Sequence, residues 1–187
     1  EIEDRRTIPY SSIPHVPAST VKGHDGMLVR GRWQGREIIL MSGRVHKYEG
    51  HSFSRIALPV QLLGAMGIEV LVLTNAAGGV NKSFSTGDLM LIDDHINFTG
   101  GNPLEGTNDD RIGPRFPDMT EVYDAQLRAL AMKCAAQEGI KLHRGVDTSV
   151  LGPSSEPPAA RPRARVLRRD PLGTIAGLPP LAAVPRA

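Results

Sequence analysis

The chain has 187 residues, of which 40% are apolar and 22% are charged, values typical of a soluble globular domain with one sizeable core. It has no apolar run of membrane-spanning length and no signal peptide, so we expect a cytoplasmic protein. A single cysteine, Cys134, excludes an internal disulfide framework.

The net charge of +2 is unevenly distributed along the chain. From Gly152 onward there are six arginines and two acids, a balance of +4, which leaves −2 for the preceding residues. The basic excess therefore belongs to the tail, and the body gives no electrostatic reason to expect nucleic acid as a partner.

The first predicted elements are two strands. Residues 1–20 contain three prolines and little periodicity, and we interpret them as an extended lead-in. Met27–Trp33 and Arg36–Met41 are predicted to be two strands, and Gln34-Gly35 between them is predicted to form a hairpin turn. Polar segments flank this hairpin: residues 19–26 contain His24, and residues 42–51 are the densest cluster of functional side chains in the chain.

A helix and a buried strand are predicted next. Apolar spacing predicts the helix over Ser54–Met66, with Pro59 in its first turn or at a kink. Leu71–Thr74 is short, apolar and followed by the small residues of Asn75–Gly79, which favours a central strand covered on both faces. Ligands bind at the carboxyl end of such strands, and small residues leave backbone N–H groups open to an anion. A plain tight turn is an equal alternative for Asn75–Gly79.

The remaining body of the chain completes an α/β layered pattern. Asp88–Asp93 and His143–Leu151 are predicted strands, and Phe98–Asp118 is a long loop, either functional or disordered. Thr120 is predicted to cap a helix over Glu121–Glu138. One predicted core-facing row on this helix contains four residues: Tyr123, Leu127, Leu130 and Cys134.

The segment from Gly152 to Ala187 differs in composition. It contains eight of the fifteen prolines and no aromatic residue. We therefore predict that residues 1–151 form the α/β domain and that residues 152–187 are disordered or non-native.

Two clusters could carry chemistry. Arg44 and His46 lie two residues apart, so on a strand both would point to one face and could bind phosphate oxygens, with Tyr48 continuing the alternation. The alternative is a solvated basic strand end. The run Asp93, Asp94 and His95 could suggest a metal site, but no second ligand cluster supports one; a polar strand end is favoured, and no metal is predicted. No dinucleotide, Walker or nucleophile-elbow motif occurs.

Several long motifs resemble those of the trimeric purine nucleoside phosphorylases. They are STVKGHDG (19–26), GRVHKYEGH (43–51), VLVLTNAAGGVN (70–81), GDLMLIDDHIN (87–97), NPLEGTNDDRIGPRFPDM (102–119) and, more faintly, GPSSE (152–156). The resemblance covers about Pro9 to Val146 and implies a phosphorylase/hydrolase-like α/β domain with a central mixed sheet flanked by helices, incomplete in this chain.

The resemblance also implies an activity: inosine or guanosine and phosphate yield the free base and ribose 1-phosphate. Phosphate is then a co-substrate, no cofactor is needed, and the assembly is a homotrimer. Position by position, the implied phosphate ligands are His24, Arg44, His46 and the backbone N–H of Ala76. The implied nucleoside contacts are Tyr48, Ala76, Phe116 and Glu156, with Phe116 reaching into a neighbouring subunit's site.

The chain departs from the family pattern in three places. A serine-bearing glycine-rich loop is absent before the chain begins, and Ser155 stands where the family has phenylalanine. The asparagine that assists the leaving base has no counterpart, so the catalytic residue is unknown. We therefore expect a chain that is truncated at its N-terminus, has a frameshifted or otherwise aberrant tail, and has impaired activity. Two alternatives are a methylthioadenosine phosphorylase and a non-catalytic phosphate- or nucleoside-binding fragment.

Overall fold

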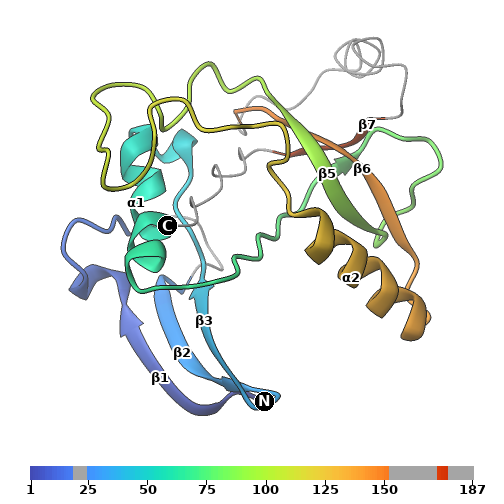
Figure 1. The fold of residues 1–187 in the computed structure, drawn as a ribbon, viewed down its shortest axis with the longest axis horizontal. Coiled ribbons are helices and arrows are strands. Elements are labelled where there is room, and N and C mark those ends of the chain that lie inside the picture. Colours follow the sequence, from blue (N-terminus) through green and yellow to red (C-terminus); the bar gives the residue numbers. More distant parts are fainter. Residues whose placement is uncertain (19–24, 152–171, 177–187) are drawn as a thin grey trace. The chain divides into compact units, whose positions relative to one another are not determined.

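A computed structural model of the protein describes residues 1–18 and 25–151, together with the backbone of residues 172–176. The chain divides into two compact units, Glu1–Gly67 and Ile68–Ala187, which Figure 1 draws in sequence colours. Each unit combines strands with a helix, so the α/β class predicted from the sequence is confirmed.

The first unit is built on a three-stranded antiparallel sheet in the order β1-β2-β3. The strands are β1 (Glu3–Pro9), β2 (Met27–Trp33) and β3 (Arg36–Ser42). The predicted hairpin is confirmed, because Trp33 pairs with Arg36 across a turn in which Gln34 and Gly35 both have positive φ. The proline-containing lead-in supplies β1, which the sequence analysis did not predict as a strand.

Helical elements complete this unit: η1 (Tyr10–Ser12), η2 (Lys47–Glu49) and α1 (Phe53–Ala65). The α1 helix begins after Ser52, whose Oγ accepts a hydrogen bond from the backbone N–H of Arg55 at 3.3 Å. Pro59 lies inside α1 and is buried, so the first-turn alternative is wrong, and a kink at this residue stays a prediction. The buried apolar side chains of the unit are Tyr10, Leu28, Val29, Val45, Ala57, Val60 and Leu63.

The second unit is built on a mixed four-stranded sheet in the order β4-β7-β6-β5. The strands are β4 (Gly78–Gly79), β5 (Leu89–Asn97), β6 (Leu142–Ser149) and β7 (Leu172–Ala176). β5, β6 and β7 are parallel, whereas β4 pairs antiparallel with β7. Buried Val80 and Val146 form a small core, against which Ile96 and Val150 pack.

Strand β7 falls within the segment 152–187, where the sequence analysis predicted no packed element. Residues 152–171 and 177–187 lie outside the described residues, so disorder there stays a prediction.

The predicted central strand at Leu71–Thr74 is wrong. This segment is not in a strand, and the side chains of Val70, Val72 and Leu73 are exposed, that of Val72 by 77%. A strand forms only where a neighbouring backbone completes its hydrogen bonds. Among the described residues, neither sheet includes this segment.

The second helix, α2 (Ala125–Gln137), begins later than predicted. Asp124, not Thr120, is its cap and accepts a hydrogen bond from the backbone N–H of Leu127 at 2.9 Å. The predicted core-facing row is also wrong, because Cys134 is exposed and Leu130 is 54% exposed. Polar contacts explain the different orientation, since Arg128 on the opposite face is hydrogen-bonded to the sheet.

Candidate functional site

Arg44, His46 and Tyr48 lie just beyond β3 in the first unit. The strand ends at Ser42, and Gly43 has a φ of 93°, which side-chain-bearing residues rarely adopt. The prediction that Arg44 and His46 share one face of a strand is therefore wrong, because a loop and the short helix η2 place them. The buried Tyr10 fixes this loop by donating a hydrogen bond from Oη to the carbonyl oxygen of Gly43 at 2.8 Å.

His46 caps η2 and is paired with Glu49. Its Nδ1 lies 2.9 Å from Glu49 Oε1, and its backbone N–H donates to the same oxygen at 2.6 Å. Both side chains are almost fully buried, with exposures of 9% for His46 and 2% for Glu49. The sequence analysis missed Glu49, although a polar residue followed three positions later by glutamate is a known capping signal.

Tyr48 stacks on His46, with the ring centroids 4.8 Å apart and the planes 15° from parallel. Arg44 is half-buried, and burial lowers the pKa of its guanidinium, an effect that its interaction with Tyr48 partly opposes. The loop after β3 thus gathers a guanidinium, an imidazole and an aromatic ring, which together can bind an oxyanion and cover an apolar group.

The other predicted site residues belong to the second unit or lie outside the described residues. Ala76 and Phe116 belong to the second unit, where Ala76 is exposed and Phe116 is 88% exposed. His24 and Glu156 lie outside the described residues. Arg44, His46 and Tyr48 thus share one loop of the first unit.

The long loop that carries Phe116 is ordered by its own polar groups. Nη1 of Arg115 donates hydrogen bonds to the carbonyl oxygens of Leu104 and Gly106 at 2.6 and 2.8 Å. Nδ2 of Asn108 reaches the carbonyl oxygen of Gly113 at 3.1 Å. These contacts hold a loop without strands or helices in a defined conformation.

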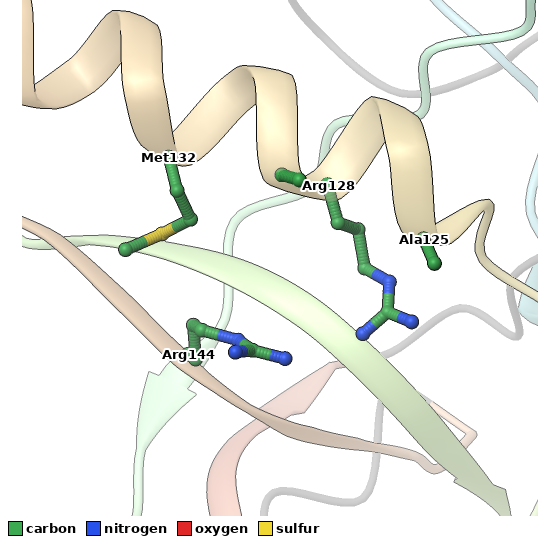
Figure 2. A pocket seen from close by; sticks show the side chains of 5 residues that line it. Ala125, Arg128, Met132 and Arg144 are labelled. Atoms are coloured by element: carbon green, nitrogen blue, oxygen red, sulfur yellow. The ribbon is translucent and has the colours of Figure 1, made fainter.

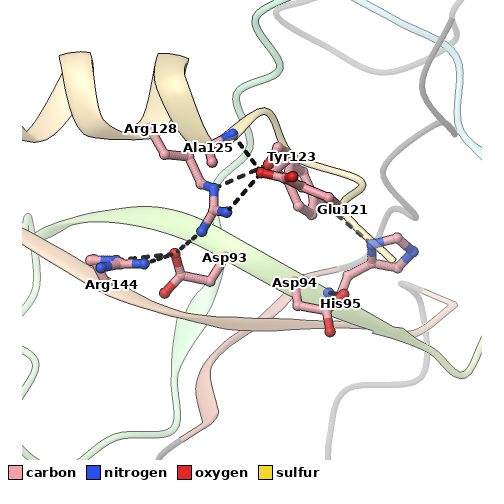
Figure 3. A network of polar contacts seen from close by, with 8 residues as sticks. All are labelled: Asp93, Asp94, His95, Glu121, Tyr123, Ala125, Arg128 and Arg144. Atoms are coloured by element: carbon pink, nitrogen blue, oxygen red, sulfur yellow. Dashed lines mark hydrogen bonds and ion pairs between the residues drawn. The ribbon is translucent and has the colours of Figure 1, made fainter. Parts of the chain in front are cut away.

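The acidic run on β5 forms a polar network with α2 and β6, shown in Figure 3. Oδ1 of Asp93 accepts hydrogen bonds from Nη1 of Arg128 at 2.7 Å and from Nε and Nη2 of Arg144 at 3.0 and 2.8 Å. Burial raises the pKa of Asp93, but the hydrogen bonds from Arg144 and Arg128 outweigh it, and the net shift is downward. Asp93 is therefore a structural anion between two arginines.

His95 lies farther along β5 in the same network. Oη of Tyr123 and Nδ1 of His95 are 3.2 Å apart, with the two rings edge to face. Burial lowers the pKa of His95, despite the opposing charges of Asp94 and Asp147. In the neutral tautomer that carries its proton on Nε2, Nδ1 of His95 accepts a hydrogen bond from the Tyr123 hydroxyl.

A small cavity of about 140 Å³ lies between α2 and β6 (Figure 2). Its lining residues are Ala125, Arg128, Ala129, Met132 and Arg144. The two arginines that line it are those that bind Asp93, so its polar groups already serve the interface between helix and sheet.

Within residues 1–18 and 25–151, no group of three or more His, Cys, Asp or Glu side chains is arranged to hold a metal ion. No helix in the described part of the chain is long and apolar enough to cross a membrane.

Comparison with known families gives a match over residues 1–173 to the model described as the phosphorylase superfamily. The matched range extends past Leu151 into the segment for which the sequence analysis predicts an aberrant tail.

Curated proteins that are similar to this chain are named purine nucleoside phosphorylases. Purine nucleoside phosphorylase 1 of Geobacillus stearothermophilus is 50% identical over 173 residues, which are 92% of this chain and 63% of that protein. The purine nucleoside phosphorylase of Mus musculus is 44% identical over 92% of this chain and 61% of its own length. The chain thus spans less than two thirds of these relatives.

A solved structure of purine nucleoside phosphorylase from Schistosoma mansoni in complex with inosine superposes with a TM-score of 0.87 and 37% identity. The match covers 94% of this chain and 62% of that one. Isoform 2 of the same enzyme, in complex with cytosine and ribose-1-phosphate, gives a TM-score of 0.86 and 42% identity.

Proposed function

Because the chain belongs to the phosphorylase superfamily, we propose that it functions in the phosphorolysis of purine nucleosides, in which inosine or guanosine and phosphate give the free base and ribose 1-phosphate. The observation that carries this proposal is the loop after β3, where Arg44, buried His46 and stacked Tyr48 lie together. The names of the similar proteins and the inosine complex of the S. mansoni enzyme support the choice of substrate.

The chemistry explains why such a loop is needed. Phosphate attacks the sugar carbon as the bond to the base breaks, so the sugar carries positive charge in the transition state. A phosphate dianion held beside it stabilises that charge. In this proposal the phosphate ligands are His24, Arg44, His46 and the backbone N–H of Ala76. The nucleoside contacts are Tyr48, Ala76, Phe116 and Glu156.

The same proposal includes the co-substrate, the cellular location and the assembly of the protein. The protein would use phosphate as a co-substrate without a cofactor, act in the cytoplasm, and assemble as a homotrimer in which Phe116 contacts a neighbouring site. The 88% exposure of the Phe116 side chain is compatible with such a contact. Residues 1–151 would carry the phosphorylase-like domain, and residues 152–187 the aberrant tail.

A second candidate is a non-catalytic binding fragment. The observation that favours it is the exposed segment Val70–Thr74, which directly precedes the proposed phosphate contact at Ala76. If no sheet supports this segment, the amide of Ala76 is poorly positioned, while Arg44 and His46 can still bind phosphate. This chain would then bind the anion without turning over a nucleoside.

Release of hypoxanthine from inosine, with and without phosphate, tests the proposal. We expect phosphate-dependent release that Arg44→Ala lowers at least tenfold and that Arg36→Ala, in the hairpin, leaves unchanged. Methylthioadenosine, assayed in parallel, would be the better substrate if the alternative phosphorylase were correct. Phosphate binding without turnover of either nucleoside would support the fragment and reject catalysis by this chain.

A further inference from the structure

The turn Asn75–Gly79 carries the backbone N–H of Ala76, which is a phosphate contact in the proposed function. The segment before the turn, Val70–Thr74, is mostly exposed, and neither sheet of the described residues pairs it. The turn ends in β4, which pairs with β7, and the next residue, Val80, is buried in the small core of the second unit. The position of the Ala76 amide therefore depends on the contacts made at the end of the turn.

Phe84 packs against that end of the turn. A methyl group placed on Gly79 would lie 3.5 Å from Cβ and 4.0 Å from Cδ2 of Phe84, which are van der Waals distances. Phe84 therefore lies on the side of the Gly79 backbone where a side chain would point. Its own loop holds it there, because the backbone N–H of Phe84 donates to the carbonyl oxygen of Asn81 at 3.1 Å. Oδ1 of Asn81 in turn accepts hydrogen bonds from the backbone N–H and Oγ of Ser83 at 3.0 and 2.9 Å.

His143 on β6 packs on Phe84 as well. The ring centroids are 4.3 Å apart, and the ring planes are tilted by 39°. Nε2 of His143 lies 2.8 Å from Oδ2 of Asp88, and the same oxygen accepts a hydrogen bond from the backbone N–H of Ser85 at 2.9 Å. The hydrogen bonds from Ser85 and His143 lower the pKa of Asp88, so its carboxylate is ionised at neutral pH and Nε2 is the donor. Nζ of Lys141 lies 3.8 Å from that oxygen, and the ring that supports Phe84 is thus tied to the loop before β5.

We propose that Phe84 is a positioning residue for phosphate binding, because it fixes the end of the Asn75–Gly79 turn and thereby the Ala76 amide. The inference rests on the proposed function, since it assumes that this amide contacts phosphate. It assigns a role to the loop between β4 and β5, which contains none of the predicted site residues. A hydrogen bond to an anion depends steeply on distance and angle, so a binding group must be held by side chains that are themselves locked by packing.

Phe84→Leu removes the ring but keeps an apolar side chain. We expect phosphate to bind about tenfold more weakly, measured by calorimetry, because the amide of the turn is displaced. Phe84→Tyr keeps the ring and should restore most of the affinity. The matched control is Phe98→Leu, at a 51% exposed phenylalanine of the same unit, which should bind phosphate as the wild type does.

The calorimetric outcomes separate this inference from the proposed function. If the wild type bound phosphate and Phe84→Leu bound it equally well, the positioning role of Phe84 would be rejected and the proposed function would stand. If the wild type did not bind phosphate at all, the proposed function would fail, and the inference would fail with it.

Nuclear magnetic resonance of the wild type gives a readout that needs no variant. The α protons of Gly79 lie beside Phe84, so we expect ring-current shifts in their resonances, which Phe84→Leu should abolish. Titration with inorganic phosphate should shift the amide resonances of Ala76 and Gly79 together with the ring resonances of Phe84. A shift at Ala76 that left Gly79 and Phe84 unchanged would overturn the inference, even if Phe84→Leu did not fold.

Discussion

Arg144 on β6 donates two hydrogen bonds, from Nε and Nη2, to one carboxylate oxygen of Asp93 on β5. Asp93 is the residue at which the register of the two strands shifts, between Ile92 and Asp94. Such a bulge turns a side chain out of the regular alternation. The bulge therefore presents Asp93 to Arg128 on α2 as well, and one carboxylate links the helix to two strands (Figure 3).

Asp93→Asn should destabilise the second unit. A neutral amide cannot balance the positive charges of Arg128 and Arg144, and the side chain of Arg128 is only 20% exposed. The two guanidinium groups would then lie near one another without an anion between them. We expect a loss of about 1–2 kcal/mol in the free energy of unfolding, measured with urea. The control is Asp109→Asn, which removes an exposed pair with Arg111 and should leave the midpoint unchanged. Equal effects of the two substitutions would contradict this account.

The contribution of Asp93 should depend on pH in a defined direction. Its pKa in the folded protein is lowered, so folding favours the ionised carboxylate. The contribution is fully present above the unfolded pKa of about 3.9 and is lost as the pH falls through the lower folded value. Urea unfolding of wild type and Asp93→Asn from pH 7 to pH 2 should therefore converge in acid. If the difference in free energy of unfolding between wild type and Asp93→Asn stayed constant across that range, the charge of Asp93 would not be the cause of its stabilising effect.

Tyr10→Phe should weaken the loop that holds Arg44. The substitution removes the hydrogen bond from Oη to the carbonyl oxygen of Gly43, in a site where burial raises the pKa of Tyr10 to about 12. We expect a loss of about 1 kcal/mol in stability and weaker phosphate binding, measured by urea unfolding and calorimetry. Ser12→Ala removes an exposed side-chain hydrogen bond to Pro9 and is the matched control. The prediction fails if both substitutions have the same small effect.

Local signals in the sequence predicted local structure well. The hairpin at Gln34-Gly35 was predicted correctly because its turn chemistry lies within adjacent residues. The capping contact between His46 and Glu49 could have been found in the same way, since it spans three residues. Arg44, His46 and Tyr48 lie in a loop and the short helix η2 rather than on a strand, and their role as site residues stays a prediction.

The features that were predicted wrongly depend on contacts between residues far apart in the sequence. The contact of Arg128 with Asp93 joins residues 35 positions apart, and that of Arg144 with Asp93 joins residues 51 apart. Neither pair has a sequence signature, yet the contact of Arg128 with Asp93 selects the face of α2 that meets the sheet. Leu71–Thr74 has the composition of a buried strand, but composition cannot supply the neighbouring strands that burial requires.

Arg44→Lys should separate charge from geometry in phosphate binding. Lysine keeps the positive charge but loses the planar fork that can donate two parallel hydrogen bonds to an oxyanion. We expect phosphate affinity to fall about tenfold, with little change in the thermal midpoint. Arg36→Lys in the β2–β3 hairpin, on an exposed residue, provides the comparison and should bind as the wild type does. Full affinity in Arg44→Lys would indicate that a point charge is sufficient.

The exposed segment Val70–Thr74 should make this chain prone to association. Val70, Val72 and Leu73 present apolar surface on a segment that neither sheet of the described residues pairs, and such a segment can pair with another copy. Val72→Lys places a charge at the most exposed of these positions and should lower light scattering at high protein concentration without lowering the thermal midpoint. A matched substitution at a buried valine, Val29→Lys, should instead unfold the first unit, because Val29 is only 4% exposed. If Val72→Lys destabilised the protein as Val29→Lys does, Val72 would be buried in solution and the predicted central strand would be restored.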